Sequence, residues 1–400
     1  MDSTRLAELA AWVNEAGLAG LPETQMLTGF CERMVAAGVP LLNAAVFIDT
    51  LHPVHEGRMF RWYRTKEATF AEYGRSGETD TSERWRRSPF YRLVETGESM
   101  LQRRVTAANA AEFPVLADLK ESGGTDYVAI ITRFAASGII GGMDCVYSSW
   151  TTDAPDGFSQ PQVTALQKLA PFLALAVKTA SLARIADTLV QTYLGRDAGR
   201  RVLSGRIARG ITDRIDAVLW FSDLRGFTKI TDTADPGEII PLLNDYADAV
   251  ISAIHAEEGD VLKLMGDGTL AIFPAADRAS ACRRALTAAG AARQAIGELN
   301  RRRAAAERPI TEMYLGLHVG EVFYGNVGSQ ERLDFTVVGP AVNEVSRIAA
   351  MCRSVDQPVL LSSAFASALA EPERVVSVGR YALRGVGQPQ DLFTLDPGHD

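Results

Sequence analysis

Two aspartates are placed where they could hold metal ions over a polyphosphate. Asp223 follows an apolar strand predicted at residues 217–221, and Asp267 lies at the tip of a hairpin predicted from strands 261–265 and 269–273. A carboxylate at a strand end that opens into a helix suits magnesium, because backbone N–H groups at the helix start then face the phosphate oxygens. Taken singly, each aspartate also fits a turn residue or a helix cap.

A second pair, Asn343 and Arg347, lies four residues apart in a helix predicted at residues 341–351. At that spacing both side chains project from one face of the helix. The guanidinium fork of an arginine suits a trigonal-bipyramidal phosphoryl group, which makes Arg347 a candidate for stabilising a transition state. The alternative for Arg347 is a surface salt bridge.

The elements that must position these residues follow a recognisable order. After the strand at 217–221, the pattern predicts a helix at 236–257, the hairpin, an Ala-rich helix at 278–303, strands near 314–327 and 335–338, the helix at 341–351, and closing strands near 358–361 and 375–394. The order strand–helix–hairpin–helix–strand predicts a ferredoxin-like α+β core.

These segments resemble the class III adenylyl and guanylyl cyclase family over about residues 216–395. The resemblance rests on five motifs in order: FSDLRGFT at 221–228, KLMGDG at 263–268, GLHVGEV at 316–322, DFTVVGPAVNEVSRI at 334–348 and LRGVG at 383–387. A chance match to one motif is easy, whereas five in order argue against Asp223 and Asp267 being plain turn residues.

The resemblance implies a two-metal site. Asp223 and Asp267 match the family's metal-binding aspartates, and the carbonyl of Leu224 is a further ligand. Two Mg²⁺ or Mn²⁺ ions per active site would lower the pKa of the ribose 3′-hydroxyl and shield the triphosphate, so that no side-chain base is required. The segment that follows is expected to contact the substrate phosphates: Gly226, Phe227 and Thr228.

The resemblance also implies roles for three residues near the phosphates and the ribose. In the family, the asparagine at Asn343 positions the ribose and the arginine at Arg347 neutralises charge in the transition state. Arg384, in LRGVG, is expected to reach the β- or γ-phosphate, with a surface role as the alternative. Pro340 departs from the aspartate common in the family, but proline suits the first turn of a helix.

The choice of purine depends on Lys263 and Thr336. A lysine at position 263 matches the family's donor to adenine N1, and Thr336 stands where most members have an aspartate that accepts from the adenine amino group. This combination resembles the class IIIb subgroup, and a hydroxyl still accepts a hydrogen bond. The resemblance therefore implies adenylate cyclase activity on ATP. The alternatives are a guanylate or dual-specificity cyclase, or a catalytically silent nucleotide-binding scaffold.

In this family the active site lies between two catalytic domains. The metal aspartates Asp223 and Asp267 come from one partner, and Lys263, Thr336, Asn343 and Arg347 come from the other. Because one chain carries all six, the resemblance implies a symmetric homodimer with two sites.

The remaining chain predicts three parts: a domain at 1–160, a helical linker at 161–212 and a catalytic domain at 213–400. Strands near 42–48, 58–64, 100–105, 127–134 and 138–150, with helices at 22–37 and 89–96, make the first domain an α+β domain that resembles a GAF sensor. A small-molecule ligand is an expected partner of this domain. Its aromatic residues fit either a ligand pocket or a core: Phe60, Trp62, Tyr91 and Tyr127.

A long helix is predicted at residues 160–194, either as a parallel seam with a phase shift or as a terminal helix packed on its own domain. His52 and His55, three residues apart across a proline, are better explained as a loop than as metal ligands.

Composition narrows the class of protein further. The 400 residues carry a net charge of −8 with no basic stripe, which argues against nucleic acid as a partner. No stretch is expected to span a membrane, and the start lacks the pattern of a secretory signal. The four cysteines are scattered without a CxxC pair, which favours a reducing compartment and predicts a cytoplasmic protein.

Overall fold

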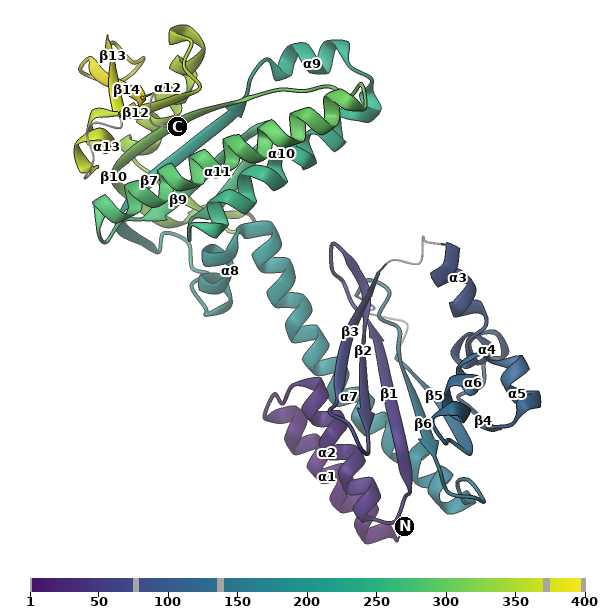
Figure 1. The fold of residues 1–400 in the computed structure, drawn as a ribbon. Coiled ribbons are helices and arrows are strands. Elements are labelled where there is room, and N and C mark those ends of the chain that lie inside the picture. Colours follow the sequence, from purple (N-terminus) through teal and green to yellow (C-terminus); the bar gives the residue numbers. More distant parts are fainter. Residues whose placement is uncertain (1, 75–78, 135–139, 370–374, 397–400) are drawn as a thin grey trace. The chain divides into compact units, whose positions relative to one another are not determined.

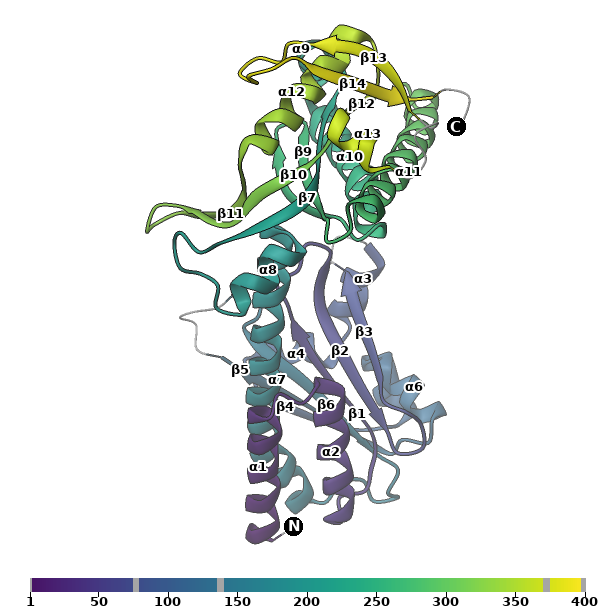
Figure 2. The same ribbon diagram turned by 90° about the vertical axis from the view of Figure 1, so that its left-hand side faces the viewer.

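The chain forms two compact units, each with its own sheet and core. The computed structural model describes residues 2–74, 79–134, 140–369 and 375–396 and is drawn in Figures 1 and 2. The units comprise Met1–Leu189 and Val190–Asp400.

The first unit is built on a six-stranded antiparallel sheet in the order β3-β2-β1-β6-β5-β4. The strands are β1 (Leu41–Asp49), β2 (His55–Tyr63), β3 (Thr69–Gly74), β4 (Met100–Arg104), β5 (Asp126–Arg133) and β6 (Cys145–Thr152). The helices are α1 (Ser3–Leu18), α2 (Glu23–Ala36), α3 (Thr79–Arg86), α4 (Pro89–Thr96), α5 (Ala107–Glu112), α6 (Val115–Glu121) and α7 (Gln160–Leu194). Figure 1 shows α1, α2 and α7 on one face of the sheet and α3 to α6 on the other.

Alternation along the strands supplies a core to both faces of this sheet. In β5, Val128 and Ile130 face the core shared with α1, α2 and α7, whereas Tyr127, Ala129 and Ile131 face α4 and α6. Helix α4 ends at Gly97, which adopts a left-handed conformation (φ 73°) that glycine takes without steric cost. The unit is thus an α+β domain, as predicted, while its likeness to a GAF sensor stays a prediction.

Helix α7 has the bounds predicted from the sequence. Its inward residues from Val163 to Ile185 belong to the core of the first unit, so this part packs on its own domain. Among the described residues, α7 is also the one helix whose length and composition would allow it to cross a membrane, and 44% of its most apolar 18-residue window is buried within the protein. The sequence-based expectation that no segment reaches this length and apolarity was wrong, because the many alanines of α7 add to the apolarity of its leucines and valines.

The second unit contains an eight-stranded sheet in the order β13-β14-β12-β10-β7-β9-β8, with β11 paired to β10. Its strands are β7 (Thr212–Leu224), β8 (Asp260–Met265), β9 (Gly268–Pro274), β10 (Met313–Gly328), β11 (Leu333–Val338), β12 (Val359–Ser362), β13 (Val375–Tyr381) and β14 (Gln390–Leu395). Its helices are α8 (Arg196–Leu203), α9 (Phe227–Thr233), α10 (Pro236–Ala256), α11 (Arg278–Ala305), α12 (Pro340–Val355) and α13 (Ser363–Ala368). Figure 2 shows β10 and β11 as a long hairpin.

Two cores sandwich this sheet. Val218 and Trp220 of β7 face the core formed with α10 and α11, whereas Ala217 and Leu219 face the core formed with α8 and α12. Alanines of α11 bring that helix close to α10 and the sheet. The order β7–α10–β8–β9–α11–β10 is the strand–helix–hairpin–helix–strand order predicted from the sequence, which places β7 between β10 and β9.

Some predicted elements differ from the observed ones. The strand predicted at 138–150 begins only at Cys145, and residues 138 and 139 lie outside the described residues. Strand β3 was not predicted. It lies at the edge of the sheet and none of its residues is fully buried, so its sequence carries only a weak apolar pattern. Helix α8 was also not predicted, since the glycines that flank and interrupt it resemble a connector.

Candidate active site

The carboxylates of Asp223 and Asp267 meet at one edge of the sheet in the second unit. Strand β7 pairs antiparallel with β9 so that Ser222 lies opposite Thr269, which brings the end of β7 beside the turn that precedes β9. The backbone N–H of Leu224 donates to Asp223 Oδ1 at 3.1 Å. A Cβ on Gly268 would lie 3.2 Å from the Ser222 carbonyl oxygen, so a glycine suits the close approach of the two segments.

The two carboxylates repel each other. Partial burial of the carboxyl group, and then the neighbouring Asp267 carboxylate, raise the pKa of Asp223 to about 6. Neither aspartate forms an ion pair with a cationic side chain in the described part of the chain.

The donor set fits a hard divalent cation held by few protein ligands. Mg²⁺ is bound through one or two carboxylates together with substrate phosphates. No cluster of three or more His, Cys, Asp or Glu occurs among the described residues. The donors that this part of the chain could offer to a cation are the two carboxylates and the backbone carbonyl of Leu224. Asp223, Asp267 and Leu224 therefore fit the predicted metal ligands.

Lys263 contacts a residue that the sequence analysis missed. Its Nζ donates to Asp334 Oδ2, and both side chains are partly exposed. Thr336 follows two residues later on β11, so it shares a strand face with Asp334, while Phe335 and Val337 are buried on the other face. Alternate residues of a strand share one face, so the sequence could have identified Asp334, two residues before Thr336, as its neighbour on that face.

Asn343 and Arg347 lie on the exposed side of α12, as their spacing predicted. Ala341, Val345 and Ile348 bury the opposite side of this helix, which fixes its orientation on the sheet. Helix α12 begins at Pro340, so the prediction that this proline starts the helix is confirmed.

Within one chain, the predicted site residues form separate groups. No hydrogen bond or ion pair among the described residues joins Asn343, Arg347 or Arg384 to Asp223 or Asp267. Arg384 is exposed in the turn between β13 and β14. Two of the predicted phosphate contacts, Phe227 and Thr228, open α9, and Gly226 before them adopts a left-handed conformation (φ 70°).

A known sequence family matches the part of the chain that contains these residues. The model of the adenylate and guanylate cyclase catalytic domain matches residues 212–396. These residues form a class III nucleotide cyclase domain. The match includes every site residue named above, from Asp223 to Arg384.

Curated relatives of the cyclase domain include uncharacterized proteins of Mycobacterium tuberculosis and Mycobacterium bovis. Each is 34% identical over 209 residues, which is 51% of this chain and 36% or 38% of the relative. The chain thus spans little more than a third of the length of these relatives.

Several solved structures of cyclases are similar to the chain. The adenylyl cyclase CyaB of P. aeruginosa matches 46% of this chain and 96% of its own at 22% identity (TM-score 0.43), and the guanylyl cyclase Cya2 matches 47% and 97% at 28% identity (TM-score 0.42). A bacterial light-regulated adenylyl cyclase matches 88% and 94% at 14% identity (TM-score 0.48).

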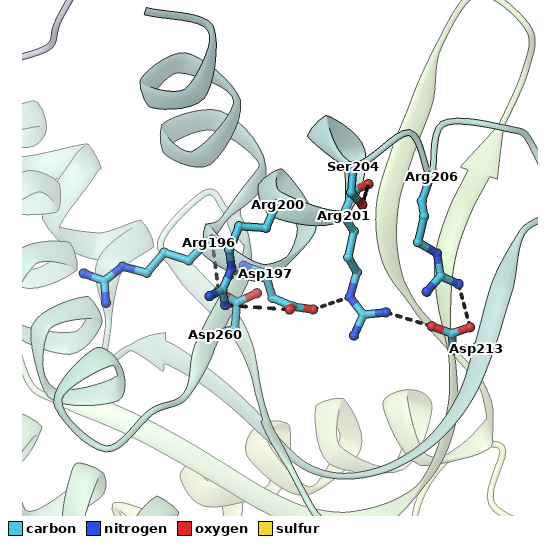
Figure 3. Close-up of polar contacts among 8 residues, drawn as sticks. All are labelled: Arg196, Asp197, Arg200, Arg201, Ser204, Arg206, Asp213 and Asp260. Carbon is cyan, nitrogen blue, oxygen red and sulfur yellow. Dashed lines mark hydrogen bonds and ion pairs between the residues drawn. The ribbon is translucent and has the colours of Figure 1, made fainter. Parts of the chain in front are cut away.

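Helix α8 is fixed to the cyclase domain by charged side chains (Figure 3). Asp260, at the start of β8, accepts the backbone N–H groups of Arg196 and Asp197 at 3.1 and 3.3 Å. Arg201 donates to Asp197 at 2.5 Å and to Asp213 of β7 at 2.7 Å. The start of α8 is thus bound to the same strand that carries Lys263.

Gly195 permits this approach. It adopts φ 90°, and a Cβ there would lie 2.5 Å from the Val261 carbonyl oxygen of β8. A side chain at this position would push β8 and the join between α7 and α8 apart.

The first unit contains a cavity of about 1160 Å³. The cavity lies over one face of the sheet beside α3, α4 and α6, and its lining includes Asn43, Asp49, Tyr73, Tyr127, Tyr147 and Ser149. Of the four aromatic residues considered from the sequence, Tyr127 lines the cavity, whereas Phe60 and Trp62 belong to the opposite core. Tyr91 is not among the lining residues and stacks edge-on against Trp85.

His52 lies in the loop between β1 and β2, and His55 is the first residue of β2. His52 Nδ1 accepts the backbone N–H of Val54 at 3.1 Å, and His55 Nε2 contacts Glu72 at 3.0 Å. The interpretation of this segment as a loop is therefore correct for His52, whereas His55 already belongs to a strand.

Proposed function

We propose that the chain is an adenylate cyclase that converts ATP into 3′,5′-cyclic AMP and pyrophosphate. The observation that carries the proposal is the pair of carboxylates, Asp223 and Asp267, without a cationic partner in the described structure, beside a hairpin that also bears Lys263. A carboxylate pair of this kind is costly to the fold and is well suited to divalent cations that accompany a nucleotide triphosphate.

Asp223, Asp267 and the Leu224 carbonyl would hold two Mg²⁺ or Mn²⁺ ions, which lower the pKa of the ribose 3′-hydroxyl and shield the triphosphate. The hydroxyl oxygen attacks the α-phosphorus in line, pyrophosphate leaves with the bonding electron pair, and the hydroxyl proton passes to water. Gly226, Phe227 and Thr228, at the turn after β7, contact the phosphates.

The active site is shared between two copies of the chain. Asn343 and Arg347 are exposed on α12 and free of intramolecular contact with the carboxylate pair in the described residues, which supports their acting on a substrate bound to a partner's aspartates. Asn343 positions the ribose, and the Arg347 guanidinium neutralises the charge that develops on the phosphoryl oxygens. Arg384 extends this positive charge toward the β- or γ-phosphate.

ATP is the preferred substrate because of the donors and acceptors on β8 and β11. Lys263 donates to adenine N1, and the Thr336 hydroxyl accepts from the adenine amino group. Guanine instead presents an N1–H donor at the position that Lys263 reads.

The first unit regulates this activity. Its cavity is large enough for a small-molecule ligand, and α7 leads from its core to Gly195 and α8. Asp260, which binds the start of α8, lies three residues before Lys263 on β8. A change in the linker is therefore transmitted to the strand that carries Lys263.

The decisive experiment incubates the full chain with ATP or GTP and Mg²⁺ or Mn²⁺ and identifies the product by chromatography. Cyclic AMP from ATP, lost in Asp223→Ala and Asp267→Ala, supports the proposal. Cyclic GMP as the main product would identify a guanylate or dual-specificity cyclase, and no product under any condition would favour a silent scaffold.

The shared site is tested by mixing inactive variants. Asp267→Ala chains mixed with Arg347→Ala chains should regain activity, because each heterodimer contains one intact site. Failure to regain activity, with heterodimers shown to form, would refute the shared site.

A further inference from the structure

We propose that Asp334 positions Lys263 for purine recognition and thereby sets the preference for ATP over GTP. The inference rests on the proposed function and adds to it a residue that acts through Lys263. It starts from the contact between Lys263 Nζ and Asp334 Oδ2.

The contact joins two different hairpins. Lys263 lies on β8, which pairs with β9, and Asp334 lies on β11, which pairs with β10 opposite Val327. Register within either hairpin does not bring these residues together, so the ion pair depends on how the two hairpins pack. Asp334 is fixed by the β10–β11 ladder, whereas Lys263 has a flexible four-carbon stem.

Stability does not explain the pair. The side chains of Lys263 and Asp334 are 43% and 44% exposed, and exposed ion pairs contribute about 0–1 kcal/mol to folding. Asp334 also shares a face of β11 with Thr336, and the buried residues Phe335 and Val337 lie on the other face. The Lys263–Asp334 pair contributes little to stability, is accessible to solvent and lies near Thr336, so it is well placed to contact a bound base.

The chemistry of purines shows what the pair does. Adenine presents an acceptor at N1 and a donor at its amino group, whereas guanine presents an acceptor at O6 and a donor at N1. A mobile ammonium group can donate to adenine N1 or shift to guanine O6. Asp334 occupies one of the three N–H groups of Lys263 and restricts the position of the other two. The ammonium group is thereby held for the acceptor at adenine N1.

The test is a double-mutant cycle on the full chain with ATP and GTP as substrates. Asp334→Ala should raise KM for ATP about fivefold, the upper end for an exposed ion pair, and lower the ATP:GTP ratio of kcat/KM by a similar factor, with kcat nearly unchanged. Asp334→Glu should restore part of the ratio. Adding Asp334→Ala to Lys263→Ala should have no further effect, because Asp334 acts through the lysine.

Glu331→Ala serves as the control, since Glu331 is an exposed carboxylate in the turn that precedes β11. An unchanged ATP:GTP ratio in Asp334→Ala, or an effect of this change that persists in the Lys263→Ala background, would overturn the inference. If the wild-type chain prefers GTP, both the ATP assignment and this inference are wrong.

If the wild-type chain makes no cyclic product, the proposed function fails, and the same variants are compared by the binding of fluorescent ATP and GTP analogues. A rise in the ratio of the Kd for ATP to the Kd for GTP in Asp334→Ala would still support the inference, and an unchanged ratio would overturn it.

Discussion

Replacing Asp223 by Asn should stabilise the metal-free protein and abolish its activity. The substitution keeps the shape of the side chain and removes its negative charge. Because burial and the Asp267 carboxylate raise the pKa of Asp223 to about 6, ionised Asp223 destabilises the folded cyclase domain at neutral pH. Asparagine removes this repulsion, and it also removes a charged ligand for the metal ions.

The size of the effect follows from the pKa. A carboxyl group whose pKa rises from 3.8 to about 6 costs about 3 kcal/mol at pH 7 if it is fully shielded from water. The Asp223 side chain is only partly buried, so solvent screens the interaction and about 1 kcal/mol is expected. In a unit of this size, that corresponds to a rise in Tm of about 2–4 °C.

The sign of the pH dependence is fixed. Between pH 3.8 and about 6 the folded state binds more protons at this site than the unfolded state, so the cost of Asp223 grows as the pH rises through this window. The advantage of Asp223→Asn should therefore be full at pH 7.5 and roughly half as large at pH 5.

Calorimetry of the full chain measures both effects. The transition of the cyclase domain is identified in the wild type as the one that shifts upward with Mn²⁺. Asp223→Asn should raise this transition in the presence of a chelator and abolish its response to Mn²⁺. Asp248→Asn, an exposed aspartate of α10, is the matched control. A lower Tm without metal, or an unchanged response to Mn²⁺, would falsify the reasoning.

Three further results are expected. Burial lowers the pKa of His318 to about 4, so the folded state loses stability as the pH falls from about 6.5 toward 4. Urea unfolding at pH 5 should show a loss of about 2 kcal/mol in the wild type and no such loss in His318→Gln. An equal loss in the variant would contradict this. Arg303→Met leaves Asp245 without its buried cation and should lower the free energy of unfolding by about 3 kcal/mol; a neutral effect in the same assay would refute this role. Gly195→Ala should raise KM for ATP, since its Cβ would displace β8, whereas Gly205→Ala, at a similar φ but with no neighbour within 4 Å, should affect stability alone; equal kinetics for the two would exclude the contact with β8.

Local signals in the sequence predicted much of the cyclase fold. The apolar strand before Asp223 and the Gly-Asp-Gly turn at Asp267 are short-range patterns. They located β8 and β9 to within one residue, whereas the strand predicted at 217–221 covers only the middle of β7. The four-residue spacing of Asn343 and Arg347 likewise predicted a shared helix face.

Contacts between distant elements were beyond the reach of these patterns. The Lys263–Asp334 pair joins two hairpins whose packing no local pattern reports. Helix α8 depends on Asp260, more than fifty residues away, for the acceptor at its start. The cavity of the first unit is formed by several strands and helices together, which is why single aromatic residues were poor guides to it.

The anchoring of α8 determines where this protein can be recombined with others. Residues 195–213 are bound by Asp260 of β8 and by the Arg201–Asp213 and Arg206–Asp213 pairs, so they belong to the cyclase domain although they resemble a connector. A chimaera that carries a foreign sensor should therefore be joined within α7, upstream of Gly195. A junction after residue 205 would remove α8 and its contacts with Asp260 from the cyclase domain.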